Sequence, residues 1–83
     1  MFKTILTKSA LKDFKKLDKN IQETIKKKLT LFQSNPLNYA IKLTNYEIGS
    51  YRFRIGKYRV IFDLDEDKII ILKIGHRKDI YMN

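Results

Sequence analysis

The most constraining feature of this chain is a run of alternating apolar and basic residues on both sides of a glycine. The run extends from Tyr51 to Phe62, with Gly56-Lys57 near its centre. Alternation predicts strands with one buried face, and a glycine between two such runs predicts a tight hairpin turn. If Gly56-Lys57 is a two-residue loop, the apolar and basic residues separate onto opposite faces. The apolar face carries Tyr51, Phe53, Ile55, Tyr58, Val60 and Phe62, and the basic face carries Arg52, Arg54 and Arg59.

The basic face has an unfavourable arrangement if it carries no ligand. The hairpin register places Arg54 opposite Arg59, and like charges opposite each other destabilise an antiparallel pair. Arginine also presents a planar fork that binds phosphate through two hydrogen bonds. The pattern therefore favours a face that binds RNA or DNA, and an ordinary solvated strand face is the alternative.

Two segments before Pro36 show helical spacing of apolar residues. The first covers residues 10–17 and follows Thr7 or Ser9, either of which can cap a helix. The second starts after Asp18 and ends just before Pro36, because proline disfavours the helical conformation in the residue that precedes it.

The remaining segments predict strands and one long connection. Residues 2–7 are short and β-branched, which is typical of a strand, and residues 36–49 show no periodicity and predict a loop. Further strands are expected at 50–55, 58–64 and 68–74. The fold class is therefore α+β, in the order β-α-α-β-β-β, with two helices packed on one face of a small antiparallel sheet.

The register of the last strand depends on the acidic turn at residues 65–67. With a three-residue loop, Lys73 lies beside Arg59 on the basic face, and the alternate residues face the core. Those core residues would be Ile70, Leu72 and Ile74. A two-residue loop would reverse this pattern.

Length and composition limit the class of protein. The 83 residues make one domain, 1–83, with a formal charge of +9, which favours a polyanionic or acidic partner. The chain has no cysteine and one histidine, so we expect no metal site and no cofactor. It also lacks a secretory signal or a membrane-spanning run. We therefore expect a cytoplasmic protein without a membrane partner.

Two motifs together resemble the RelE/ParE superfamily of bacterial and archaeal toxins. The first is Tyr-Arg-Xaa-Arg-Xaa-Gly-Xaa-Tyr-Arg at 51–59, and the second is His-Arg-Lys-Xaa-Xaa-Tyr at 76–81. The order of the elements agrees, so the resemblance covers essentially the whole chain. The tyrosine that follows the arginine in the second motif is similar to the RelE branch rather than to the ParE branch.

That resemblance implies the toxin of a type II toxin–antitoxin system, a metal-independent endoribonuclease that cuts messenger RNA in the ribosomal A site. The 2′-hydroxyl of the substrate attacks the adjacent phosphate. The resemblance implies four catalytic residues, which are Arg54, Arg59, Arg77 and Tyr81. The implied RNA-binding residues are Arg52, Lys73, His76 and Lys78. An acidic antitoxin is expected to cover the helices or to displace the segment near residues 77–81.

The chain departs from the family at the positions of its proton-transfer chemistry. The best-described RelE branch has lysines where this chain has Arg52 and Arg54, and arginine is a poor general base. His76 and Tyr81 are the remaining candidates for proton transfer. Three alternatives stay open: a ParE-like inhibitor of DNA gyrase, a catalytically inactive homologue that binds an antitoxin, and an RNA-binding module without toxicity.

Overall fold

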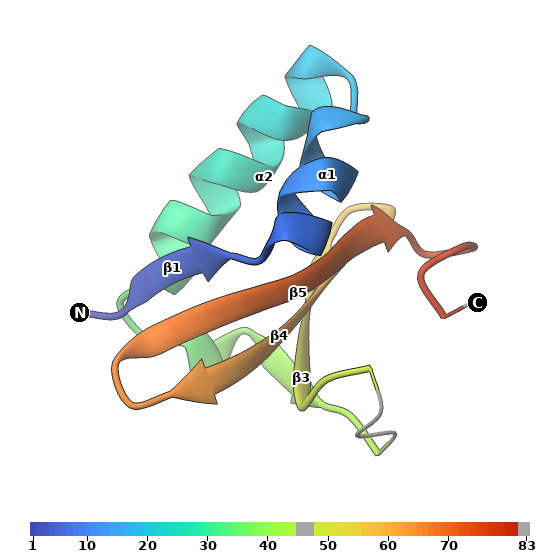
Figure 1. Cartoon of the computed structure of the whole chain (residues 1–83). Coiled ribbons are helices and arrows are strands. Elements are labelled where there is room, and N and C mark those ends of the chain that lie inside the picture. Colours follow the sequence, from blue (N-terminus) through green and yellow to red (C-terminus); the bar gives the residue numbers. More distant parts are fainter. Residues whose placement is uncertain (45–47, 82–83) are drawn as a thin grey trace.

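The computed structural model describes residues 1–44 and 48–81. In this part of the chain, two α-helices lie on one face of a five-stranded sheet, as the α+β prediction requires (Figure 1). The elements are β1 Lys3–Leu6, α1 Lys8–Lys15, α2 Lys19–Phe32, the 3₁₀ helix η1 Pro36–Asn38, β2 Ala40–Lys42, β3 Tyr51–Ile55, β4 Tyr58–Asp65 and β5 Lys68–His76. No helix in the described part of the chain is long and apolar enough to cross a membrane.

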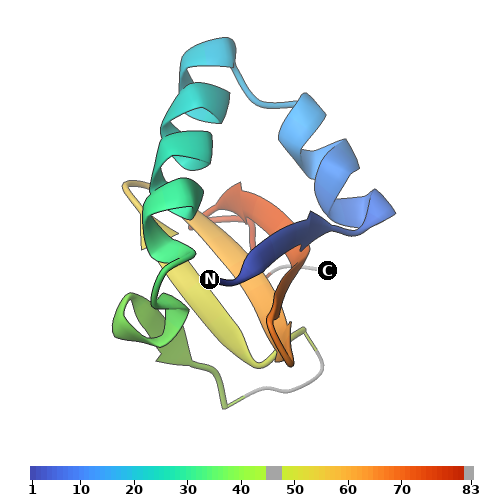
Figure 2. The same cartoon turned by 90° about the vertical axis from the view of Figure 1, so that its left-hand side faces the viewer.

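The sheet is mixed, so the expected purely antiparallel sheet is wrong in one respect. The strand order is β1-β5-β4-β3-β2, and β1 runs parallel to β5, with Lys3 opposite Lys68 and Leu6 opposite Ile71. The two helices carry the chain from β1 across one face of the sheet, and the antiparallel strands then return to it (Figure 2). The first strand therefore covers the edge that the last strand would otherwise leave unpaired.

The segment 36–49 is more ordered than the predicted loop, which is a second correction. It contains η1 and the edge strand β2, which pairs antiparallel with β3. The ring of Tyr39 stacks on Phe32 with 4.5 Å between centroids, and Pro36 is buried. A three-residue strand is too short for periodicity to reveal, and residues 45–47 lie outside the described part of the chain.

The hairpin between β3 and β4 has the predicted register. Arg54 lies opposite Arg59 and Phe53 opposite Val60, and Gly56 takes the left-handed conformation at φ 59°. Phe53 and Val60 are fully buried beneath the helices. The turn therefore sorts apolar and basic residues onto opposite faces of the sheet.

The acidic turn is a two-residue loop rather than a three-residue one. Asp65 pairs with Lys68, and Glu66 takes the left-handed conformation at φ 55°. As a result Ile69 and Ile71 are buried in the core. The prediction that Ile70 and Leu72 face the core is therefore wrong.

A bulge in β5 then restores the predicted pattern at the end of that strand. Ile61 lies opposite Lys73, whereas the next residue, Phe62, lies opposite Ile71, which leaves Leu72 without a partner in the register. The extra residue shifts the alternation by one position. Lys73 therefore shares a face with the arginines, and Ile74 lies in the core, as expected.

The core between the helices and the sheet is built on stacked aromatic rings. Phe53 lies 4.6 Å from Phe32 of α2 and 4.2 Å from Phe62 of β4, measured between ring centroids. The N-terminus of α1 is fixed by Thr7, whose Oγ1 accepts from the Ala10 amide at 3.1 Å. This core holds the hairpin rigidly from the helix side, so the opposite face can carry charge.

Helix α1 also completes the edge of β5 where β1 stops. The pairing of β1 ends at Leu6, after which the Thr7 amide donates to the Ile71 carbonyl at 3.1 Å. Further along β5, the Ile74 amide donates to Oδ2 of Asp13 at 3.0 Å. Asp13 thus satisfies a backbone donor just before the turn at residues 77–81, which we call the C-terminal turn.

Replacing Asp13 should lower the free energy of unfolding, because its carboxylate accepts a hydrogen bond from the backbone of β5. Asp13→Ala leaves the Ile74 amide without its acceptor, so we expect the free energy of unfolding in urea to fall by about 1–3 kcal/mol. Asp65→Ala, at an exposed carboxylate, is the matched control and should change it by less than about 0.5 kcal/mol. Equal losses in the two variants would contradict this role for Asp13.

Candidate functional site

Four arginines and a tyrosine gather on the sheet face that the helices leave uncovered. Because Phe53 and Val60 point toward the helices, their strand neighbours Arg52, Arg54 and Arg59 point away from them. The C-terminal turn adds two further side chains. We call the set Arg52, Arg54, Arg59, Arg77 and Tyr81 the arginine surface.

Arg59 is the buried centre of the arginine surface. Its exposed fraction is 8%, and its Nη1 donates to the carbonyls of Gly56 at 3.0 Å and Tyr58 at 2.9 Å. Burial lowers the pKa of Arg59, as do the nearby positive charges of Arg54, Arg52 and Arg77, whereas Tyr81 acts in the opposite direction. Arginine stays protonated at neutral pH all the same. The other four members of the surface therefore lie near enough to influence the charge of Arg59.

Arg52 contacts the C-terminal turn directly. Its Nη1 donates to the hydroxyl oxygen of Tyr81 at 2.7 Å. The Nε of Arg52 is buried and has no hydrogen-bond partner among the described residues. An unpaired buried donor is costly, so it is a position at which a ligand oxygen would be favourable.

The turn after β5 is held by backbone hydrogen bonds. The Arg77 amide donates to the Lys57 carbonyl at 2.7 Å, which extends the pairing of β5 with the hairpin turn. The amides of Asp79 and Ile80 then both donate to the His76 carbonyl at 2.9 Å. The chain thus folds back over the arginine surface.

The predicted RNA-binding residues Lys73, His76 and Lys78 lie in different parts of the structure. Lys73 is half-buried on the face of the arginines, opposite Ile61, and Lys78 is exposed in the turn. His76 lies opposite Tyr58, with the two rings edge to face at 5.5 Å between centroids, and its Nδ1 accepts from the Lys78 amide at 3.1 Å. Tyr58 lies on the helix side, so the strand register does not bring His76 onto the arginine surface.

Sequence reasoning missed an apolar layer on the arginine side of the sheet. Ile61 has an exposed fraction of 0% and Ile80 of 1%, and neither belongs to the core beneath the helices. Gly49, at φ 148°, packs so closely that an added Cβ would lie 2.5 Å from Ile61 Cγ2. One sequence signal for this layer was available. Ile61 lies between Val60 and Phe62, so an apolar residue stands where the alternation calls for a polar one.

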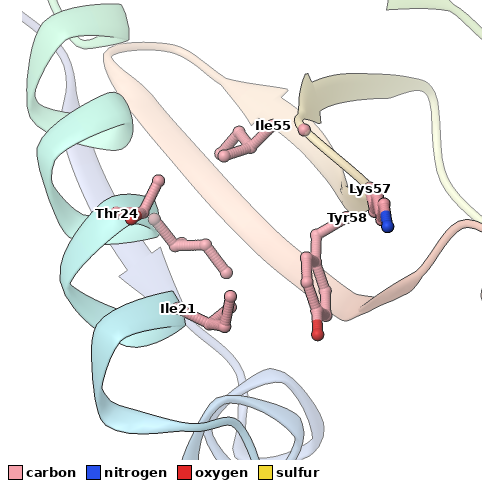
Figure 3. Close-up of a pocket in the computed structure, with 7 residues that line it drawn as sticks. Ile21, Thr24, Ile55, Lys57 and Tyr58 are labelled. Atoms are coloured by element: carbon pink, nitrogen blue, oxygen red, sulfur yellow. The ribbon is translucent and has the colours of Figure 1, made fainter.

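An apolar pocket of about 180 Å³ lies on the helix side of the sheet (Figure 3). It opens between α2 and the β3–β4 hairpin. Its lining residues are Ile21, Thr24, Ile25, Ile55, Gly56, Lys57 and Tyr58. This pocket could not be predicted from the sequence, because its walls come from segments about 30 residues apart.

The arginine surface is suited to the chemistry of a phosphodiester. Fixed cations can neutralise the phosphate oxygens and stabilise the additional negative charge of a transition state. No group of three metal-binding side chains occurs within residues 1–44 and 48–81. Arg52, Arg54 and Arg59 supply the positive charge that the strands carry on this face.

Removing one of the paired arginines should stabilise the free protein. Arg54→Gln relieves the repulsion with Arg59, so we expect the free energy of unfolding at low ionic strength to rise by about 0.2–1 kcal/mol. The gain should shrink in 1 M salt, where the Debye length is about 3 Å. Lys27→Gln removes the same charge from the exposed face of α2 and is the control. A loss of stability in Arg54→Gln beyond that of the control would contradict the repulsion.

Comparison with known proteins places the chain among toxins. Residues 4–81 match the family described as the ParE toxin of the type II toxin–antitoxin system, parDE. Toxin RelE3 of Methanocaldococcus jannaschii is 32% identical over 83 residues, which span 95% of this chain and 94% of that protein.

Two solved structures have a similar fold. The RelB–RelE antitoxin–toxin complex of Methanococcus jannaschii includes a chain that is 33% identical, with a TM-score of 0.73 over 93% of this chain and 94% of that one. A chain of the toxin–antitoxin complex RelBE2 of Mycobacterium tuberculosis has a TM-score of 0.83 at 24% identity, over 92% of this chain and 98% of that one. The latter likeness concerns the fold alone.

Proposed function

The chain belongs to the RelE/ParE superfamily of type II toxins, and we propose that it is a ribosome-dependent endoribonuclease that cleaves messenger RNA in the A site. The observation that carries this proposal is the arginine surface, where Arg52, Arg54 and Arg77 all act on the buried Arg59. A concentration of like charges on one sheet face is unfavourable in the free protein and becomes favourable when a polyanion binds.

The proposed reaction uses the nucleophile that RNA itself carries. The 2′-hydroxyl oxygen attacks the adjacent phosphorus, and the bond from phosphorus to the 5′-oxygen of the next nucleotide breaks. The products are a 2′,3′-cyclic phosphate and a 5′-hydroxyl. The reaction requires stabilisation of the crowded phosphate and a proton for the leaving oxygen.

Arg59 and Arg54 are proposed to stabilise the phosphate. Two carbonyls hold Nη1 of Arg59, so its remaining N–H groups are preorganised toward a ligand. Arg54 is exposed directly opposite and can approach the same phosphate. Because the cations are already in place before RNA binds, little reorganisation is needed in the transition state.

Tyr81 is proposed to donate a proton to the leaving oxygen. Its hydroxyl oxygen accepts a hydrogen bond from Arg52, so its own hydrogen is directed elsewhere. Arg77, which lies in the same turn as Tyr81, is proposed to supply a further positive charge. Arginine effectively cannot act as a base, so the proton of the 2′-hydroxyl passes to water in this scheme. Lys73 and Lys78 are proposed to contact the flanking RNA. His76, which the strand register places on the helix side of the sheet, has no role in the proposed reaction.

Arg77→Ala should abolish most of the cleavage without unfolding the protein, because Arg77 is exposed. Loss of one transition-state donor lowers kcat by about 100- to 1,000-fold. The measurement maps new messenger-RNA 5′ ends on translating ribosomes, with Lys27→Ala as a control for the lost charge. Intact RNA with folded wild-type protein would overturn the proposal, and unchanged cleavage by Arg77→Ala would remove Arg77 from the mechanism.

Inhibition of DNA gyrase is the second candidate function, favoured by the match to the ParE toxin family. A nuclease surface on the sheet is not needed for that activity. Supercoiling assays with purified gyrase distinguish the two, because a gyrase inhibitor would block supercoiling and leave messenger RNA intact. A protein that does neither and still binds its antitoxin would be an inactive homologue.

We also propose an acidic antitoxin as the partner, in line with the complexes that contain related toxins. The net charge of +9 favours an acidic chain. The pocket beside α2 can receive an apolar side chain, and Lys57 at its wall can attract a neighbouring carboxylate (Figure 3). The partner segment should therefore carry an apolar residue flanked by acidic ones.

Thr24 and Thr30 provide a matched test of this pocket. Both are exposed on α2 and donate from Oγ1 to the carbonyl four residues earlier, but Thr24 lines the pocket. Thr24→Arg fills the opening, so we expect the affinity for the antitoxin to fall about tenfold or more, or about 1.4 kcal/mol. Thr30→Arg adds the same charge and should bind like the wild type. Equal affinities in a titration would place the antitoxin elsewhere.

A further inference from the structure

Ile80 is a buried aliphatic residue on the arginine side of the sheet. Its exposed fraction is 1%, although its neighbours Asp79 and Tyr81 are exposed. It does not belong to the core between the helices and the sheet. Its burial therefore comes from contacts outside that core.

Gly75 forms the seat beneath Ile80. A Cβ added to Gly75 would lie 3.2 Å from Ile80 Cδ1, and the three nearest atoms all belong to Ile80. Gly75 lies opposite Arg59 in the strand register, so this seat is at the centre of the arginine surface. The missing side chain at residue 75 leaves room for the isoleucine to pack on the strand.

The turn that carries Ile80 also carries two members of the arginine surface. Hydrogen bonds from the amides of residues 79 and 80 to the His76 carbonyl set the shape of this turn. Arg77 and Tyr81 lie at its two ends. Among the side chains of residues 77–81, Ile80 is the one that is buried, so it supplies the apolar contact between the turn and the sheet.

We propose that Ile80, seated on Gly75, is a positioning residue that holds Arg77 and Tyr81 on the arginine surface. The catalytic consequence rests on the function proposed above. Ile80 itself contacts no RNA in this account. It acts by keeping the Tyr81 hydroxyl beside Arg52, and by keeping the start of the turn, which carries Arg77, against the hairpin.

Ile80→Ala should impair the chemical step rather than binding to the ribosome. A displacement of catalytic groups by about 1 Å can cost about 100-fold, so we expect kcat to fall by about 10- to 100-fold. The KM for ribosomes should change by less than about threefold. Ile69→Ala removes the same atoms from the main core and is the control; it should lower the Tm but leave kcat within about threefold while it is folded. A wild-type kcat for folded Ile80→Ala would overturn the proposal.

A compensating pair of substitutions tests the contact between Gly75 and Ile80. Gly75→Ala introduces a methyl group against Ile80 Cδ1, and Ile80→Val deletes that same Cδ1 atom. We expect Gly75→Ala alone to lower kcat about tenfold, and to cost less than about threefold in the Ile80→Val background. Equal costs in both backgrounds would show that the contact between the two residues does not position the turn.

Hydrogen–deuterium exchange provides a readout that is independent of cleavage. If Ile80 anchors the turn, the amides of residues 79 and 80 should exchange about tenfold faster or more in Ile80→Ala, while the β3 and β4 amides remain unchanged. Unchanged exchange at residues 79 and 80 would overturn the anchor. Wild-type protein that cuts no RNA would contradict the proposed function, and the exchange result would still decide whether Ile80 holds the turn.

Discussion

The structure depends on the register of one hairpin. The two-residue turn at Gly56-Lys57 places Phe53 with Val60 in the core and Arg54 with Arg59 on the opposite face. Helices α1 and α2 cover the apolar face and supply the stabilisation that offsets the repulsion between the arginines. A shift of this register by one residue would bury the arginines and expose the aromatic residues, so fold and site are fixed together.

Much of the fold could be predicted because its strongest signals are local. The alternation at 51–62 gave the hairpin, and apolar spacing gave both helices. The parallel pairing of β1 with β5 could not be predicted this way, because it joins segments more than 60 residues apart. The strand β2 was missed because three residues carry no measurable period. At the acidic turn the sequence left the loop length open between two and three residues. The structure has the two-residue loop, and the bulge at Leu72 still places Lys73 on the face of the arginines.

The charged residues of the candidate site could be predicted from the sequence, but the contacts that hold them in place could not. The arginines stand out in the sequence, and the structure brings Arg52, Arg54, Arg59 and Arg77 together with Tyr81. The burial of Arg59 depends on carbonyls from the turn beside it, and residue type alone does not show this. Ile80 and Gly75 meet because the chain folds back after β5. His76 belongs to the same sequence motif as Arg77, yet strand alternation directs it toward Tyr58.

The central claim is that the arginine surface promotes attack by the 2′-hydroxyl of RNA on its own phosphate. The most direct test programmes ribosomes with a messenger whose A-site codon carries a single 2′-deoxy substitution at the attacking position. The ribose codon should be cut to a 2′,3′-cyclic phosphate and a 5′-hydroxyl, and the deoxy codon should stay intact while the protein still binds. Cleavage of the deoxy codon, or products with a 5′-phosphate, would contradict this claim.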